Sequence, residues 1–193
     1  GRLTVDGVWQ DSPQLVTNTD CNDISNFGPF STTNVTLSTF VNGPKTYLKV
    51  QSNQTGSSPG VVSGFINVQP GQQYQLRVKG YRGTGNVYLY VQNSGGGNIL
   101  WAGALLPAGP ANEGWVSNNF VVPIGITQVK VGALWIAGVL NDAFYINKIE
   151  LNKSHPTQGT KDFVPTAYEY QYHLKDHLGN VRLTFTTKDD VQA

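Results

Sequence analysis

The stretch that decides the fold is residues 68–80, which read Val-Gln-Pro-Gly-Gln-Gln-Tyr-Gln-Leu-Arg-Val-Lys-Gly. After the Pro-Gly turn, an apolar side chain occupies every second position from Tyr74 onward, and polar side chains fill the positions between, starting at Gln75. This period of two is typical of a strand with one face in a core and the other in solvent. The stretch therefore predicts a half-buried strand that begins directly after a tight turn.

Segments of the same kind recur along the chain at the spacing of a β-sandwich. Turns rich in Gly, Pro and Asn separate them, and the strand–helix alternation of a parallel α/β fold is missing from the sequence. The predicted fold class is therefore all-β: an antiparallel β-sandwich of the jelly-roll type with a C-terminal β-hairpin extension. The expected strands are 35–40, 46–51, 61–68, 73–81, 87–92, 99–104, 115–122, 128–136 and 143–151, with further candidates at 3–9 and 14–16.

The composition agrees with this class and limits the function. The chain has 193 residues, enough for one good core plus a tail, and its 22 Gly, 10 Pro and 13% charged residues suit a turn-rich β-protein. A net charge of +1 gives no electrostatic case for nucleic acid or an anionic membrane, and no apolar run reaches the roughly 18 residues of a membrane span. The lack of Met suggests a processed product or an excised piece, and the many Asn, Thr, Ser and Gln residues favour secretion.

A second patterned stretch, residues 168–185, consists of two alternating arms around an Asp-x-x-Gly-Asn turn, which predicts a β-hairpin. An isolated hairpin is marginal in water, so we expect this one to pair with a sheet edge of its own chain or of a neighbouring molecule. The residues predicted to mediate that assembly are Tyr168, Tyr170, Tyr172, Val181, Leu183 and Phe185, and those predicted to form the turn are Asp176, Gly179 and Asn180.

These patterns divide the chain into three expected parts. Residues 1–153 are predicted to form the jelly-roll sandwich. Residues 154–166 contain Pro, Gly, Thr and Lys without a strong period and are predicted to be a linker. Residues 167–193 are predicted to form the hairpin tail.

No catalytic constellation is apparent in the sequence, so we expect the chain not to be an enzyme. The acidic residues are scattered, and the histidines fall in the linker and tail, at His155, His173 and His177, so the sandwich has no imidazole base. His173 and His177 flank the hairpin turn, where a structural role is favoured over zinc binding. The single Cys21 excludes an intramolecular disulfide; we expect a small buried residue, with an intermolecular bridge or a reactive thiol as alternatives.

No cofactor is expected, although a structural calcium ion is an alternative. Asp20, Asp23 and Asp142 could supply oxygen ligands near the ends of the sandwich. The Asp-x-Asp-x-Asp-Gly loop of a dedicated calcium site is missing from the sequence, which favours ordinary turn-forming roles for these acids.

Two alternating strands have the chemistry of a sugar-binding surface, which requires aromatic faces beside planar polar groups. Tyr88 and Tyr90 alternate with an apolar row in residues 87–91, and Gln75 and Arg77 alternate with another in residues 74–78. If the two outward faces adjoin, they form a Tyr/Gln/Arg surface. Alternatively, the tyrosines pack beneath loops or against another subunit.

Two tryptophans flank a Gly/Pro loop and could line the rim of that surface, or they could belong to the core. With them, the predicted carbohydrate-binding residues are Tyr88, Tyr90, Arg77, Gln75, Trp101 and Trp115.

Three segments resemble the jelly-roll modules of carbohydrate-binding and galactose-binding-like families. They are residues 46–68, the Pro-Gly-x-x-Tyr-x-Leu strand start in residues 70–76, and the closing strand Phe144-Tyr-Ile-Asn-Lys-Ile-Glu-Leu. The resemblance implies the fold and a possible glycan ligand. Such modules often have Asp in the closing strand where this chain has Asn147, which weakens the transfer of a structural calcium site.

Residues 172–182, Tyr-His-Leu-Lys-Asp-His-Leu-Gly-Asn-Val-Arg, resemble a unit of the YD (Rhs-type) repeats of large surface proteins in Bacteroidetes-type bacteria. This resemblance implies a bacterial cell-surface location. The function predicted is that of a non-catalytic extracellular protein whose hairpin mediates strand pairing and self-assembly, as in a filament or surface layer; its partner would be itself or the rest of a larger surface protein. The alternative is a carbohydrate-binding module of a larger YD/Rhs-repeat protein, with a glycan as ligand.

Overall fold

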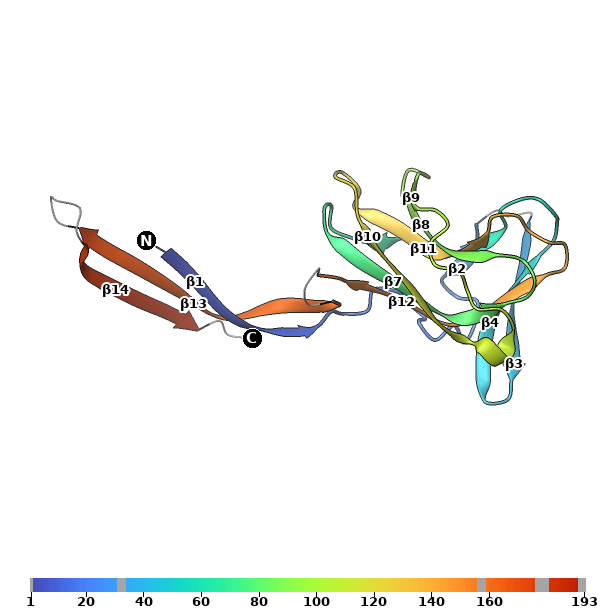
Figure 1. Cartoon of the computed structure of the whole chain (residues 1–193), viewed down its shortest axis with the longest axis horizontal. Coiled ribbons are helices and arrows are strands. Elements are labelled where there is room, and N and C mark those ends of the chain that lie inside the picture. The colour runs from blue at the N-terminus through green and yellow to red at the C-terminus, as the bar shows by residue number, and fades with distance from the viewer. Residues whose placement is uncertain (1, 31–33, 156–158, 176–180, 191–193) are drawn as a thin grey trace.

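The computed structural model describes residues 2–30, 34–155, 159–175 and 181–190, and it describes side chains within residues 10–165 of these ranges. The described chain is almost entirely β-structure, and its strands form three antiparallel sheets (Figure 1). A single turn of 3₁₀-helix, η1 (Pro110–Asn112), lies in the loop before β10. The all-β class predicted from the alternation is confirmed.

Two of the sheets form the sandwich. The five-stranded sheet has the order β10 (Gly114–Val121), β7 (Gln73–Arg82), β12 (Ala143–Lys153), β4 (Lys45–Ser52) and β3 (Val35–Asn42). The facing sheet has the order β2 (Phe27–Pro29), β5 (Gly60–Ser63), β11 (Gln128–Trp135), β8 (Val87–Asn93) and β9 (Asn98–Leu100), and β6 (Ile66–Asn67) also pairs with β11.

The core lies between these two sheets and follows the alternation of the sequence. Leu76 and Val78 of β7 are fully buried, as are Val131 and Ala133 of β11, and all four belong to one hydrophobic cluster. Trp135 and Phe144 are also fully buried, and their rings pack edge-on with centroids 4.6 Å apart. The side chains that point inward from these strands are therefore apolar, as the core of a β-sandwich requires.

The third sheet consists of β1 (Arg2–Asp11), β13 (Lys161–Lys175) and β14 (Val181–Asp190), in the order β1-β13-β14. β13 and β14 form the predicted hairpin, and β1 pairs with β13 from Arg2↔Gln171 to Asp11↔Lys161. Figure 1 shows this sheet, hereafter the arm, extending away from the sandwich. The N-terminal strand of the same chain therefore supplies the sheet edge that the hairpin was expected to need.

Two expected boundaries differ from the structure. Residues 2–11 belong to the arm rather than to the sandwich, and the expected linker 154–166 overlaps β13, which begins at Lys161. Pro165 made this segment look irregular in sequence. The ladder accommodates it because the register shifts there, between Asp6 and Gly7 of β1, and proline is tolerated in sheets at such bulges.

The predicted assembly residues Tyr168, Tyr170 and Tyr172 lie in β13, and Val181, Leu183 and Phe185 lie in β14. Tyr172 is paired with Phe185 in the hairpin ladder. The side chains of these six residues, and the turn residues Asp176, Gly179 and Asn180, lie outside what the structure describes.

Candidate functional site

The structure divides the six predicted sugar-binding residues between the two outer faces of the sandwich. Gln75 and Arg77 lie on β7 in the five-stranded sheet, whereas Tyr88 and Tyr90 lie on β8 in the facing sheet. The expectation that their polar faces adjoin is wrong. β7 and β8 follow one another along the chain but lie in opposite sheets, so their outward rows point in opposite directions.

The two tryptophans are separated in the same way. Trp101 contacts the ring of Tyr90, with ring centroids 5.5 Å apart, and so lies on the outer face of the β8 sheet. Trp115 is paired in register with Lys79 of β7 and lies on the outer face of the five-stranded sheet. The predicted common rim is therefore not formed, although neither tryptophan belongs to the core: their exposed fractions are 42% and 38%.

On the β8 face, Tyr90 is a structural residue. It is fully buried, packs edge-on against Phe30 at 4.9 Å, and its hydroxyl donates to Asn98 Oδ1 at 2.7 Å. Burial raises the pKa of Tyr90 to about 12. Together with Val62 and Leu134 it forms a second small hydrophobic cluster, which Phe30 covers. The alternative interpretation, that the tyrosines pack beneath loops, is correct for Tyr90, while Tyr88 is half-buried.

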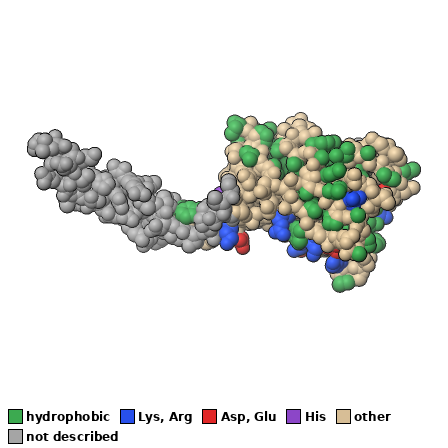
Figure 2. Space-filling view, viewed as in Figure 1, with side chains coloured by type: hydrophobic (Ala, Val, Ile, Leu, Met, Phe, Trp, Pro, Cys, Tyr) green, Lys and Arg blue, Asp and Glu red, His purple; other side chains and the backbone are tan. Residues whose placement is uncertain are grey.

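On the five-stranded sheet, the outward row contains the groups that a sugar-binding surface requires. The Arg77 guanidinium lies over the Trp115 ring, 4.4 Å from its centroid, and forms an ion pair with Glu150 of β12 at 3.5 Å. Beside this row, Gln75 Nε2 donates to Asn119 Oδ1 at 3.1 Å. Figure 2 shows that Lys and Arg side chains gather along this margin of the sandwich, near β7, β12 and β4.

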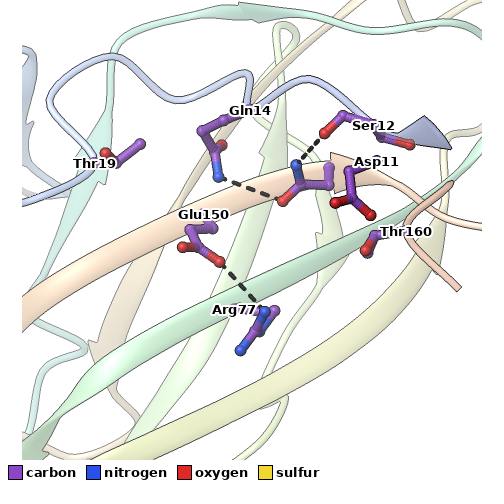
Figure 3. Close-up of a pocket in the computed structure, with 8 residues that line it drawn as sticks. Asp11, Ser12, Gln14, Thr19, Arg77, Glu150 and Thr160 are labelled. Carbon is purple, nitrogen blue, oxygen red and sulfur yellow. Dashed lines mark hydrogen bonds and ion pairs between the residues drawn. The ribbon is translucent and has the colours of Figure 1, made fainter. Parts of the chain in front are cut away.

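A polar groove of about 410 Å³ lies next to this row (Figure 3). Its volume falls within the range of small-molecule sites. The sheet provides its floor, and the segment that follows β1 provides one wall. The lining residues are Asp11, Ser12, Gln14, Thr19, Arg77, Glu150, Asn152 and Thr160.

The wall of the groove is fixed by one side chain. Gln14 Oε1 accepts hydrogen bonds from the backbone N–H groups of Leu15, Val16 and Leu151, at 2.8, 3.0 and 2.7 Å. Asn152 Nδ2 donates to the Ser12 carbonyl at 2.9 Å. These bonds explain why residues 14–16 lie along β12 without forming the strand that the sequence suggested.

A second cluster on the same face contains Phe40, Tyr47, Tyr81 and Tyr145 around a buried carboxylate. The rings of Tyr81 and Tyr145 stack at 4.6 Å. Glu113, whose side chain is 8% exposed, accepts from Lys45 Nζ at 2.6 Å and from the Tyr47 hydroxyl at 2.8 Å.

The electrostatics of this cluster follow from the same contacts. Burial by itself would raise the pKa of Glu113, but the hydrogen bonds from Lys45 and Tyr47 and the charges of Lys45 and Lys79 lower it below its ordinary value. Burial and the Glu113 carboxylate raise the pKa of Tyr47 to about 12. The carboxylate is thus held in its charged form within the sheet face.

Each of the three acids considered for calcium has a protein partner. The Asp142 carboxylate accepts from the backbone N–H groups of Thr84 and Gly85, at 3.1 and 2.8 Å. Asp23 accepts from Ser25 N at 2.7 Å, and Asp20 pairs with Lys148 at 3.2 Å. Within residues 2–30, 34–155, 159–175 and 181–190, no group of three His, Cys, Asp or Glu could hold a metal ion.

Cys21 is fully buried, and burial raises the pKa of its thiol to about 12, which agrees with the expected structural role and disfavours a reactive thiolate. His155 lies 3.2 Å from Asp162, at the junction with the arm. Of the two histidines predicted to flank the hairpin turn, His173 lies in β13 and His177 lies outside the described residues.

Most of the groove could not have been found from sequence. Its wall comes from an irregular segment without periodicity, and Thr160 lies in what was expected to be a linker. Besides Arg77, only Glu150 and Asn152 had a sequence signal, because they alternate with the buried Ile149 and Leu151 on the closing strand. Arg77 is the one residue shared by the predicted surface and the groove.

No protein-family model and no curated protein sequence matches the chain. Solved structures with the same fold include the xylan-binding CBM22-1 domain of Paenibacillus barcinonensis Xyn10C, at 6% identity and a TM-score of 0.55 over 75% of this chain and 96% of that one. Another is TmCBM61 in complex with β-1,4-galactotriose, at 12% identity and a TM-score of 0.52 over 74% and 99%.

A third similar structure is tailspike protein 4 of bacteriophage CBA120, at 17% identity and a TM-score of 0.56 over 72% of this chain. The match spans 21% of the tailspike chain. At these identities the comparisons show the fold alone, an antiparallel β-sandwich that carbohydrate-binding modules also have. In the described part of the chain, none of the helices is long and apolar enough to cross a membrane.

Proposed function

We propose that the chain is a non-catalytic glycan-binding module of a larger extracellular protein, and that it binds its ligand on the outer face of the five-stranded sheet. The observation that carries the proposal is the polar groove, whose lining residue Arg77 also lies over the ring of Trp115. Trp115 is exposed, and the groove is lined by carboxylates, amides and hydroxyls.

These groups suit the two requirements of sugar recognition. The CH face of a pyranose can stack on the exposed side of Trp115, whose other side lies under the Arg77 guanidinium. The hydroxyls of a neighbouring sugar unit of the same chain can then donate to the groove carboxylates and accept from the side-chain amides and the guanidinium. Arg77 would therefore serve both the aromatic platform and the groove.

The comparisons support this proposal at the level of the fold class. Two of the similar structures are named for xylan binding or for a bound galactotriose, so neutral polysaccharides are the ligands to test first. A secreted, cell-surface location agrees with the YD-type segment in the C-terminal hairpin.

The test is a glycan array followed by titration calorimetry with the best ligand. Trp115→Ala is expected to weaken binding by about ten- to a hundredfold, since a stacked aromatic anchor contributes on the order of 1–3 kcal/mol. Trp101→Ala is the matched control because it removes an equally exposed tryptophan from the opposite face. Equal losses in both variants, or no binding to any glycan, would refute the proposed site.

A second candidate function, self-assembly through the arm, is supported by one observation. In the described residues, β14 and β1 each pair only with β13, so both outer strands of the arm present an open edge. Long open edges are templates for strand addition, and another copy of the chain could pair there. Light scattering of the full chain and of a version lacking residues 176–193 tests this idea; the same monomeric mass for both would exclude it.

A further inference from the structure

We infer that the polar groove is shared between the sandwich and the arm, and that a ligand bound there fixes the orientation of the arm. This inference rests on the proposed glycan-binding function and adds a contact residue, Asp11, that belongs to the arm. In this view the ligand joins groups on both sides of the junction, and its binding sets the direction of the arm.

Both chain segments that connect the arm to the sandwich line the groove. Asp11 is the last residue of β1, and Thr160 directly precedes the first residue of β13. The ladder between these strands ends at the pair Asp11↔Lys161, and Ser12 N then donates to the Thr160 carbonyl at 2.8 Å. Figure 3 shows Asp11 and Thr160 beside Arg77 and Glu150, which belong to the sheet floor.

The described contacts between the arm and the sandwich are polar. Among the residues whose side chains the structure describes, the hydrophobic core cluster draws its buried members from Val16 to Leu151 and includes none of β1 or β13. The described contacts across the junction are hydrogen bonds such as Asn152 Nδ2 to the Ser12 carbonyl, and the partly exposed pairs of Asp162 with Lys153 and His155. Exposed ion pairs add little stability, so a ligand that contacts both sides of this junction would add appreciably to what holds the arm in place.

The groove offers one carboxylate at this junction that has no other role. Among the described residues, the exposed Asp11 carboxylate has no hydrogen-bond or ion-pair partner. Glu150, by contrast, is paired with Arg77. Asp11 is therefore the carboxylate available to accept from two ligand hydroxyls, and its charge selects a neutral glycan over a uronic acid at this position.

A ligand bound in this way joins Asp11 and Thr160 of the arm to Arg77 and Glu150 of the sheet. Because it would bind the aligned arrangement better than a rotated one, its binding free energy favours one arm orientation. By linkage, any partner that holds the arm in this orientation also raises the affinity for the ligand. The site thus couples glycan binding to the direction in which the arm points.

The test is hydrogen exchange of the full chain with and without β-1,4-galactotriose or soluble xylan at millimolar concentration. We expect amides of strands β7 and β10 to be protected together with those of residues 11–12 and 160–162. At saturation, Asp11→Asn should keep the protection of the strands and lose that of the junction, and it should weaken binding about tenfold, as for the loss of a charged hydrogen bond. Asp23→Asn, the same change in an exposed turn, should have neither effect.

The outcomes separate the two proposals. Protection of β7 and β10 without protection of the junction overturns the coupling and leaves the glycan site intact. Unchanged junction protection in Asp11→Asn overturns the role of Asp11. No protection with either sugar overturns the proposed function, and the coupling with it. Binding of polygalacturonate as tightly as of the neutral glycans contradicts the predicted selectivity.

Discussion

The two outer faces of the sandwich are built from strands with the same alternation, yet one is open and the other is covered. On the five-stranded sheet, Arg77 of β7 and Glu150 of β12 point outward, stay partly exposed and line a groove. On the facing sheet, Tyr90, Val62 and Leu134 point outward from the core but are buried beneath Phe30. Alternation therefore determines which side of a strand a residue occupies, and a covering loop determines whether that side is exposed.

The largest expected effect concerns the stability that burial gives the covered face. Tyr90→Ala should lower the free energy of unfolding by about 3–5 kcal/mol, as for other large-to-small substitutions of buried aromatic residues. The equivalent change in the half-buried Tyr88 of the same strand should cost about 1–2 kcal/mol. Urea denaturation of both variants measures the difference. Equal losses would mean that Phe30 does not cover Tyr90 in solution, and the contrast between the faces would fail.

The next effect concerns the buried carboxylate on the open face. Glu113→Gln should cost about 1–3 kcal/mol, because the Tyr47 hydroxyl and Lys45 lose a charged acceptor. The pKa of Glu113 is lowered in the folded state, so its contribution is present above the ordinary glutamate pKa and is lost as the pH falls through the lowered folded value.

Denaturation at a series of acidic pH values tests this sign. The wild type should lose stability toward low pH more steeply than Glu113→Gln, and the two should converge once Glu113 is protonated. Glu150→Gln is the control, because its carboxylate is more exposed and its pairing with Arg77 is longer. If the wild type and Glu113→Gln had parallel pH profiles, the carboxylate would not be held charged by its lysine and tyrosine partners.

The tyrosines provide an alkaline counterpart that involves both faces. Tyr90 on the covered face and Tyr47 on the open face both have a pKa raised to about 12, in each case mainly by burial. Neutral tyrosine stabilises the folded state fully below the ordinary pKa near 10, and this contribution is lost as the pH rises through 12. Absorbance titration should show delayed ionisation of the buried rings. Tyr90→Phe should remove one of the delayed groups, and an unchanged titration would contradict its burial.

Much of the sandwich could be predicted because its strands alternate. The ranges expected around Gln73–Tyr81, Val87–Gln92 and Gln128–Ile136 lie within about one residue of β7, β8 and β11. The pairing of those strands could not be predicted. A period of two specifies which face of a strand a residue occupies but not which strand lies next to it. The sugar-binding surface predicted from sequence therefore combined strands that belong to opposite sheets.

The groove and the arm show the same limit. Both depend on pairs far apart in sequence: Asp11 with Lys161 in the arm, and Gln14 with Leu151 beside the groove. The hairpin pattern indicated that a partner strand was needed, and nothing in residues 2–11 identified them as that strand. Local sequence patterns predict individual strands. A site formed between distant segments can be located only once the pairing of those segments is known.

The smallest expected effect lies within the open face itself. Arg77→Lys keeps the charge beside Glu150 but loses the planar group that lies over Trp115. Because this contact is at the surface, the free energy of unfolding should change by no more than about 0.5 kcal/mol. Glycan affinity should nevertheless fall about three- to tenfold, since lysine neither stacks on the indole nor offers two parallel donors.

Calorimetry on the variant compares the change in the free energy of unfolding with the change in glycan affinity, with Lys79→Arg as a control on the same strand. A loss of stability as large as the loss of binding energy would mean that Arg77 supports the sheet rather than the ligand, and the open face would then be structural like the covered one.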